Sequence, residues 1–227
     1  MITKLPRWIW FGGIILAFSA GIINAIALMS FAQQAATHVT GIFTHLSMNI
    51  FKGDSHGIQT SVYMLLSFLC GAILCGCIIM DGHLKMGRRY GVALLVECAL
   101  LLMSTYAFNK QSIWGEYFAC MAAGLQNAMV STYSGTIVRT THMTGILTDF
   151  GALLGQMLRG VRVQSLRLRI LFWIMTGFFG GGFIGVYAYT QIGYFAMLIP
   201  SIITGLTALT YFWILARSHP NASTLHS

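Results

Sequence analysis

The stretch THVTGIFT at residues 37–44 occurs a second time, as THMTGILT, at residues 141–148. The run AGIINA at residues 20–25 likewise returns as AGLQNA at residues 123–128. The two offsets are 104 and 103 residues, so one spacing holds for both blocks to within a residue. A repeat at this distance predicts that the chain consists of two homologous halves. Because the matched residues are polar in an apolar chain, they predict a site where the halves meet.

The composition is that of an integral membrane protein. Hydrophobic residues make up 56% of the chain and charged residues only 8%, with a mean hydropathy of +0.74. Soluble domains carry about 25% charged residues, so these charges are too few to cover a globule. The net charge of +8 comes from basic residues beside apolar segments. This pattern indicates membrane topology with lipid as the partner, and it argues against binding nucleic acid.

Six apolar segments are long enough to cross a bilayer, at about 20 residues per crossing. They predict one all-α membrane domain over residues 1–227, with repeat 1 at about 8–108 and repeat 2 at about 114–215, and a polar tail at 216–227. The six segments are residues 8–28, 58–80, 90–108, 114–133, 170–189 and 193–215.

The second and fifth segments also align with each other. Gly71 and Gly76 of the second match Gly180 and Gly185 of the fifth. Such glycines favour close helix packing, although the three consecutive glycines at 180–182 could instead form a hinge.

Lysine and arginine predict the orientation. If the N-terminus is cytoplasmic, eleven of these residues lie inside and two outside, which favours cytoplasmic N- and C-termini in a bacterial inner membrane. The inside set is Lys4, Arg7, Lys85, Arg88, Arg89, Arg139, Arg159, Arg162, Arg167, Arg169 and Arg217, and the outside set is Lys52 and Lys110. Three crossings per half is an odd number, so the two halves would have inverted topology.

A Thr-His-x-Thr-Gly turn follows the first segment of each half. The short runs after it, at about 41–51 and 145–158, cannot span a bilayer and predict a broken or re-entrant helix in each repeat. Thr40 and Thr144 are the expected N-caps. Gly41 and Gly145 would let the backbone approach a ligand or a neighbouring helix closely. Two half-helix N-termini meeting at one central point could bind a polar or anionic solute.

His38 and His142 are the strongest candidates for that site, because an imidazole can gain or lose a proton near neutral pH. A histidine that only ties a turn to its neighbour is the alternative. The hydroxyls of Thr37, Thr40, Thr141 and Thr144 would line the same site, or serve only as caps.

Other polar residues lie within the apolar segments. Asn24, Gln126 and Asn127 need partners in the membrane, and could contact solute or join two helices. Asp149, whose counterpart is His45, could couple to protons or pair with Arg139. Glu97 lies in the middle of the third segment, where acids are functional candidates by default.

No catalytic or metal-binding pattern is present. The sequence contains no G-x-S-x-G, H-E-x-x-H, P-loop or Rossmann motif, and no histidine at a metal-ligand offset from a cysteine. We therefore expect a protein that is not an enzyme and that uses no cofactor or metal.

At these motifs the chain resembles the YoaK family (DUF1275), multispanning bacterial membrane proteins of unknown function. The resemblance rests on residues 124–128, 139–145 and 147–149 in the second half, and on residues 20–21 and 37–41 in the first. The family usually has an acidic residue where Asn24 stands, and asparagine where Ile42 stands. The resemblance covers nearly the whole chain and implies a one-domain inner-membrane protein, but it implies no substrate.

The favoured interpretation is a small-solute secondary transporter, with protons as candidate coupling ions and alternating access by rocking of one repeat against the other. A passive channel for a neutral or anionic solute, and a non-transporting scaffold, are the alternatives. The small-residue faces of the helices are also compatible with a homodimer.

Overall fold

The computed structural model describes residues 7–31, 33–79, 88–134 and 140–218, and within these ranges it contains helices and no strand. The helices are α1 (Arg7–Leu28), α2 (Val39–Lys52), α3 (Ser55–Ile78), α4 (Arg88–Asn109), α5 (Trp114–Ser134), α6 (Met143–Leu158), α7 (Ser165–Ile192) and α8 (Leu198–Ser218), with a 3₁₀ turn η2 (Gly193–Met197) before α8.

Each of the six predicted apolar segments coincides with a long helix, namely α1, α3, α4, α5, α7 and α8. By length and composition, four stretches of the described chain could cross a membrane. They are Trp10–Leu28, Ser55–Ile78, Arg88–Asn109 and Ser165–Arg217. The last stretch runs through α7, η2 and α8, and α5 lies outside all four. The chain is therefore all-helical, with several helices of membrane-spanning character.

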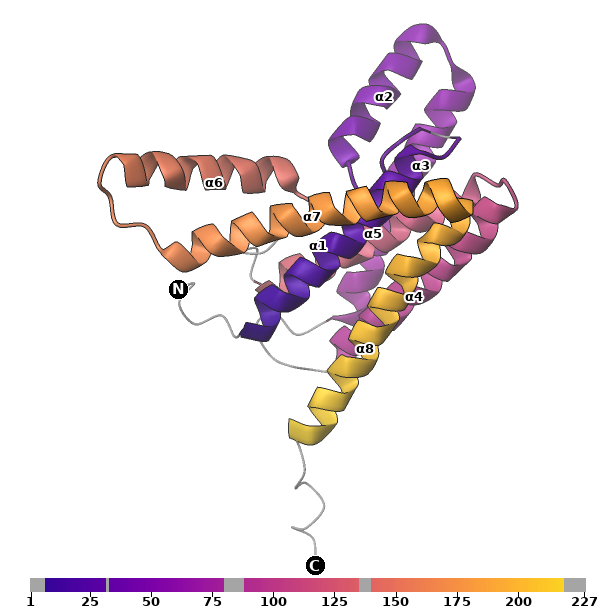
Figure 1. Cartoon of the computed structure of the whole chain (residues 1–227). Helices are drawn as coiled ribbons and strands as arrows, with labels where there is room; N and C mark the ends of the chain where they lie inside the picture. The colour runs from indigo at the N-terminus through magenta and orange to yellow at the C-terminus, as the bar shows by residue number, and fades with distance from the viewer. Residues whose placement is uncertain (1–6, 32, 80–87, 135–139, 219–227) are drawn as a thin grey trace, which may run out of the picture.

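Helices of one half of the chain pack mainly against helices of the other half (Figure 1). The first helix of the first half, α1, packs along α7 of the second half, and α5 packs in the same way along α3. In addition, α4 packs against α8, while the short helices α2 and α6 lie on α3 and α7 respectively. Interchanging α1 with α5, α2 with α6, α3 with α7 and α4 with α8 therefore reproduces the same set of pairs.

Glycines set the closest of these contacts. A side chain added at Gly21 of α1 would collide with the Phe178 carbonyl oxygen of α7, and one at Gly124 of α5 would collide with the Phe68 carbonyl oxygen of α3. Gly21 and Gly124 are a repeat-related pair, so both interfaces are built in the same way. Without a Cβ the two backbones can approach closely, which is how helices associate in lipid.

The facing helices carry small residues at the matching places. Gly177, Gly181 and Gly185 of α7 lie against Ile14, Phe18 and Ile22 of α1, one helical turn apart. Gly71 of α3 lies against the carbonyl oxygen of Met121 on α5. In the same way, Gly181 of α7 lies against the carbonyl oxygen of Phe18 on α1. Gly71 thus corresponds to Gly181, and the predicted match with Gly180 is wrong by one residue. The run 180–182 lies inside α7, where the helix is continuous.

The short helices extend away from this centre. In Figure 1, α2 and the start of α3 project at the top, and α6 and the start of α7 project to the left. Ile42 is the buried residue of α2, and Ile146 and Leu153 are those of α6. Two separate arms, one per half, therefore leave the packed centre of the molecule.

Candidate functional site

Each Thr-His-x-Thr-Gly turn is tied to the helix before it. The Thr37 hydroxyl donates to the Asn24 side-chain oxygen at 2.6 Å, and the Thr37 backbone N–H donates to the same atom at 3.2 Å. In the second half the Thr141 hydroxyl donates to the Asn127 side-chain oxygen at 3.0 Å. These amide oxygens therefore hold the turns in place, in the same way in both halves.

Histidines occupy the N-cap positions. His38 precedes α2 and His142 precedes α6, and the His142 Nδ1 accepts a hydrogen bond from the Gly145 N–H at 3.1 Å. His38 makes no such bond. The prediction that Thr40 and Thr144 are the caps is wrong, because each helix starts one residue before the threonine. The carbonyl groups of these threonines instead accept hydrogen bonds from Thr44 and Thr148 one turn later.

The glycine of each turn makes room for the histidine ring. A Cβ added at Gly41 would lie 2.6 Å from the His38 Nδ1, and one at Gly145 would lie 2.5 Å from the His142 Nδ1. The predicted close approach at these glycines thus exists, but the group that approaches is an imidazole of the same turn.

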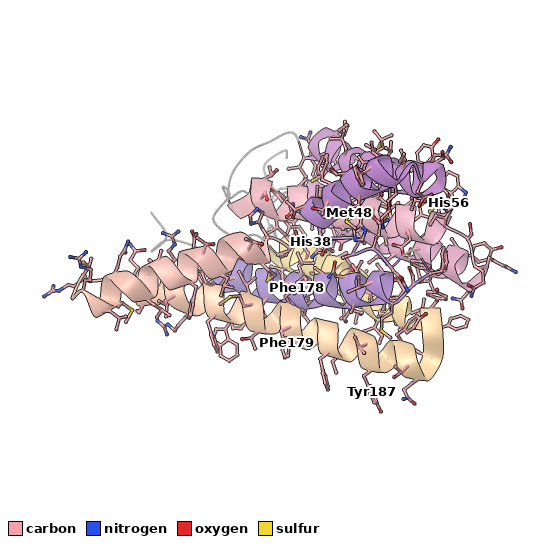
Figure 2. All side chains as sticks on the ribbon, turned by 90° about the horizontal axis from the view of Figure 1, so that it is seen from above. His38, Met48, His56, Phe178, Phe179 and Tyr187 are labelled. Atoms are coloured by element: carbon pink, nitrogen blue, oxygen red, sulfur yellow. The ribbon has the colours of Figure 1, made fainter. Side chains whose placement is uncertain are left out.

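The first turns of the two short helices point their polar groups outward. His38, His142, Thr40 and Thr144 are exposed, whereas Thr37 is buried. In both Figure 1 and Figure 2 the start of α6 lies near the start of α2, where Figure 2 labels His38. Among the described residues α2 and α6 do not pack on each other. The two turns therefore face one region without forming a closed site.

Gln126 joins two helices from the core. It is fully buried on α5, and its Nε2 donates to the Leu16 carbonyl oxygen of α1 at 2.6 Å. The side-chain oxygen of Gln126 is buried and has no hydrogen-bond partner among the described residues. This amide bridges the first helices of the two halves and keeps one acceptor free.

Asp149 lies on the surface of the second arm. It pairs with Arg167 of α7 at 3.0 Å, and both side chains are exposed. Arg139, the partner considered from the sequence, lies outside the described residues. The pair holds α6 against α7, and an exposed pair of this kind contributes at most about 1 kcal/mol.

Glu97 is the most unusual side chain of the core. It lies on α4, is fully buried, and neither carboxyl oxygen has a hydrogen-bond partner in the described parts of the chain. The Cys75 thiol of α3 and the Cys98 thiol lie within electrostatic range of it. Cys98 in turn lies against Gly205 of α8. Glu97 is thus enclosed in the core near Cys75 of α3, and the next residue along α4 is the one that meets α8.

Glu116 is a second buried acid. It lies in the first turn of α5 and accepts a hydrogen bond from the Ser30 hydroxyl, and its other carboxyl oxygen is buried with no hydrogen-bond partner among the residues that the structure describes. The Ser19 and Thr140 hydroxyls are also buried and unpartnered within the described structure. The one sequence signal for Glu116 was an acid two residues into an apolar segment.

The described residues contain no group of three or more histidine, cysteine, aspartate or glutamate side chains that could hold a metal ion. What the arrangement offers is hydroxyls, imidazoles and helix N-termini at the turns, and the two buried carboxyl groups of Glu97 and Glu116 in the core.

The sequence profile described as "Protein of unknown function (DUF1275)" matches residues 12–210. The UPF0700 transmembrane protein RA0705 of Rhizobium meliloti (strain 1021) is 28% identical over 202 residues, which cover 89% of this chain and 85% of that protein. No solved structure matches the chain. With the apolar helices described above, these matches indicate a multi-pass membrane protein.

Proposed function

Since the chain belongs to the DUF1275 family of membrane proteins, whose function is unknown, we propose that it is a secondary transporter for a small polar solute. In this proposal α1, α3, α4, α5, α7 and α8 cross the bacterial inner membrane as two inverted repeats of three, with both termini cytoplasmic. The Thr-His-x-Thr-Gly turns line the transport path.

The exchange of helices between the halves is the observation that carries the proposal. Packing of α1 on α7 and of α3 on α5 divides the molecule into two bundles, each built from both halves. The third helices complete them, α4 on α5 and α8 on α1, and the bundles meet where α4 packs on α8 and α1 on α5. Two pseudo-equivalent bundles with polar turns facing one region are the arrangement that alternating access requires.

The two turns have different parts in this mechanism. The His142 Nδ1 is occupied by the Gly145 N–H, whereas His38 makes no cap bond, so its ring nitrogens remain available to a solute. The N–H groups of Thr40 and Gly41 likewise have no partner among the described residues. Free donors at a helix N-terminus favour a solute with an anionic or strongly polar group.

Glu97 is the group we assign to proton coupling. An unpaired carboxylate in a membrane core is costly, so the side chain holds a proton while it is enclosed and releases it when the bundles separate. Its neighbour Cys98 lies against α8, so the carboxyl group is close to the α4–α8 contact, and this proximity would link its proton to the relative position of the two bundles.

A thermal-shift screen of the purified protein against metabolites, run at two pH values, tests the site. A ligand that binds only the folded state raises Tm by mass action. At a ligand concentration of a hundred times its Kd, the free energy of unfolding increases by about 2.7 kcal/mol. We expect a hit that is lost in His38→Ala and Thr40→Ala. His45→Ala, an exposed histidine on the same helix, is the matched control and should keep it.

Uptake of the hit into proteoliposomes then tests the mechanism. The wild type should move protons with the solute, and Glu97→Gln should bind the solute but carry no protons with it. Equal binding by all variants would reject the site at the turns. Uptake of the solute at a rate independent of the pH gradient would favour a passive channel over a proton-coupled transporter.

A further inference from the structure

The free end of the arm formed by α6 and α7 carries a concentration of arginines. Four lie within residues 159–169, and Asp149 is the one acid in the whole stretch 143–192. Arg167 is paired with that acid. Arg159, Arg162 and Arg169 form no ion pair with any described residue, and Arg169 donates only to the Ser165 carbonyl oxygen, at 3.4 Å. Three unneutralised guanidinium groups therefore remain at this tip.

Apolar side chains stand beside these arginines. Leu158 is 90% exposed, and Met157 and Val161 are more than half exposed. Gly160, at a φ of 77°, ends the helix between them. In Figure 2 nitrogen-bearing side chains gather at the end of this arm, away from the packed centre. Exposed apolar side chains beside arginines suit the boundary between lipid headgroups and acyl chains better than they suit water.

The other arm lacks the arginines, and the exposed apolar side chain at its tip, Phe51 at 93%, stands beside a single lysine. Its tip carries Lys52, Asp54 and His56, and the Asp54 carboxylate is used to accept the Gly57 N–H at the start of α3. Since α2 and α3 are the counterparts of α6 and α7 in the repeat, the basic tip is not a requirement of the fold.

We propose that Arg159, Arg162 and Arg169 bind the phosphate groups of anionic phospholipids, with Leu158 and Val161 inserted among the acyl chains. The planar guanidinium group pairs with two phosphate oxygens at once, and an unpaired arginine loses no existing ion pair in doing so. This interaction surface is independent of the transport proposal, because it requires no solute and no movement of the bundles.

The test uses the full-length protein in neutral detergent, titrated with short-chain phosphatidylglycerol or phosphatidylcholine while Tm is recorded. Phosphatidylglycerol should raise Tm and phosphatidylcholine should not, and added salt should reduce the difference. At about five-fold in affinity per arginine, the combined variant Arg159→Gln, Arg162→Gln, Arg169→Gln should bind on the order of a hundred-fold more weakly.

The matched control removes the same charge elsewhere, with Lys52→Gln, Arg88→Gln and Lys110→Gln, and should retain the wild-type response. Asp149→Asn removes an exposed ion pair that contributes at most about 1 kcal/mol to the arm and frees Arg167, so it should bind phosphatidylglycerol several-fold more tightly than the wild type. Equal loss in the two triple variants would overturn the proposal. So would equal protection by inorganic phosphate, or an Asp149→Asn variant with unchanged affinity.

Discussion

At the scale of single residues, the histidine of each turn explains the glycine that follows three positions later. The ring folds over the first turn of the helix, and only a residue without a Cβ leaves room for it. The repeat of histidine and glycine was visible in the sequence, and so was a helix start nearby. The predicted cap is wrong, because threonine is the common N-cap residue and the sequence does not reveal that each helix and its cap lie two residues earlier.

The two histidines should differ in their contribution to stability. His142→Ala removes the acceptor of the Gly145 N–H and should lower the free energy of unfolding by about 1 kcal/mol. His38→Ala removes no cap hydrogen bond and should cost less. Chemical denaturation in detergent measures both, and His142→Asn, which keeps a capping oxygen, should recover part of the loss. A larger cost at His38 than at His142 would contradict this assignment of caps.

At the scale of helices, the apolar segments predicted from the sequence agree with the observed helices to within a few residues at most ends. Which helices pack against each other could not be predicted from the apolar segments. A run of apolar residues gives a helix its length, but the same glycine-rich face fits any helix that offers a close backbone. The one-residue error at Gly180 has this origin, since three consecutive glycines allow several alignments.

Gly21→Ala should weaken the α1–α7 contact strongly. The added methyl group meets a backbone carbonyl of Phe178, which cannot turn away as a side chain could, so we expect a loss of at least about 1–3 kcal/mol. Gly124→Ala should cost a similar amount at the repeat-related contact. Gly12→Ala on the same α1 helix has open space and should be neutral or slightly stabilising. Equal effects at Gly12 and Gly21 would show that the close approach is absent.

At the scale of the whole molecule, the proposed inverted topology would place the tips of the two arms on opposite sides of the membrane. In a variant without the five native cysteines, Lys52→Cys and Lys110→Cys should react with an impermeant thiol reagent in intact cells. Arg88→Cys and Arg162→Cys should react only after the cells are opened. Labelling of Lys52→Cys and Arg162→Cys from the same side would exclude inverted repeats.

The repeat in the sequence predicted that the two halves would have similar structures. The polar residues at matched positions do make equivalent hydrogen bonds, from Thr37 to Asn24 and from Thr141 to Asn127. What could not be anticipated is the state of each buried group. Glu97 was a candidate from its place in an apolar segment, whereas Glu116 and the unpartnered oxygen of Gln126 emerge only once neighbouring helices are in place. Burial and hydrogen-bond partners depend on long-range packing, which a single sequence does not specify.

The exchange of partners also has a consequence for synthesis of the chain. The face of α1 around Gly21 is covered by Phe178, which is made 157 residues later. At about 5–20 residues per second, α1 waits on the order of ten seconds before its partner helix leaves the ribosome. During that time its small-residue face is open to other helices at the insertion machinery. A chain that stops after the first half would keep that face uncovered, so quality control should remove such fragments rapidly unless the second half is supplied as a separate polypeptide.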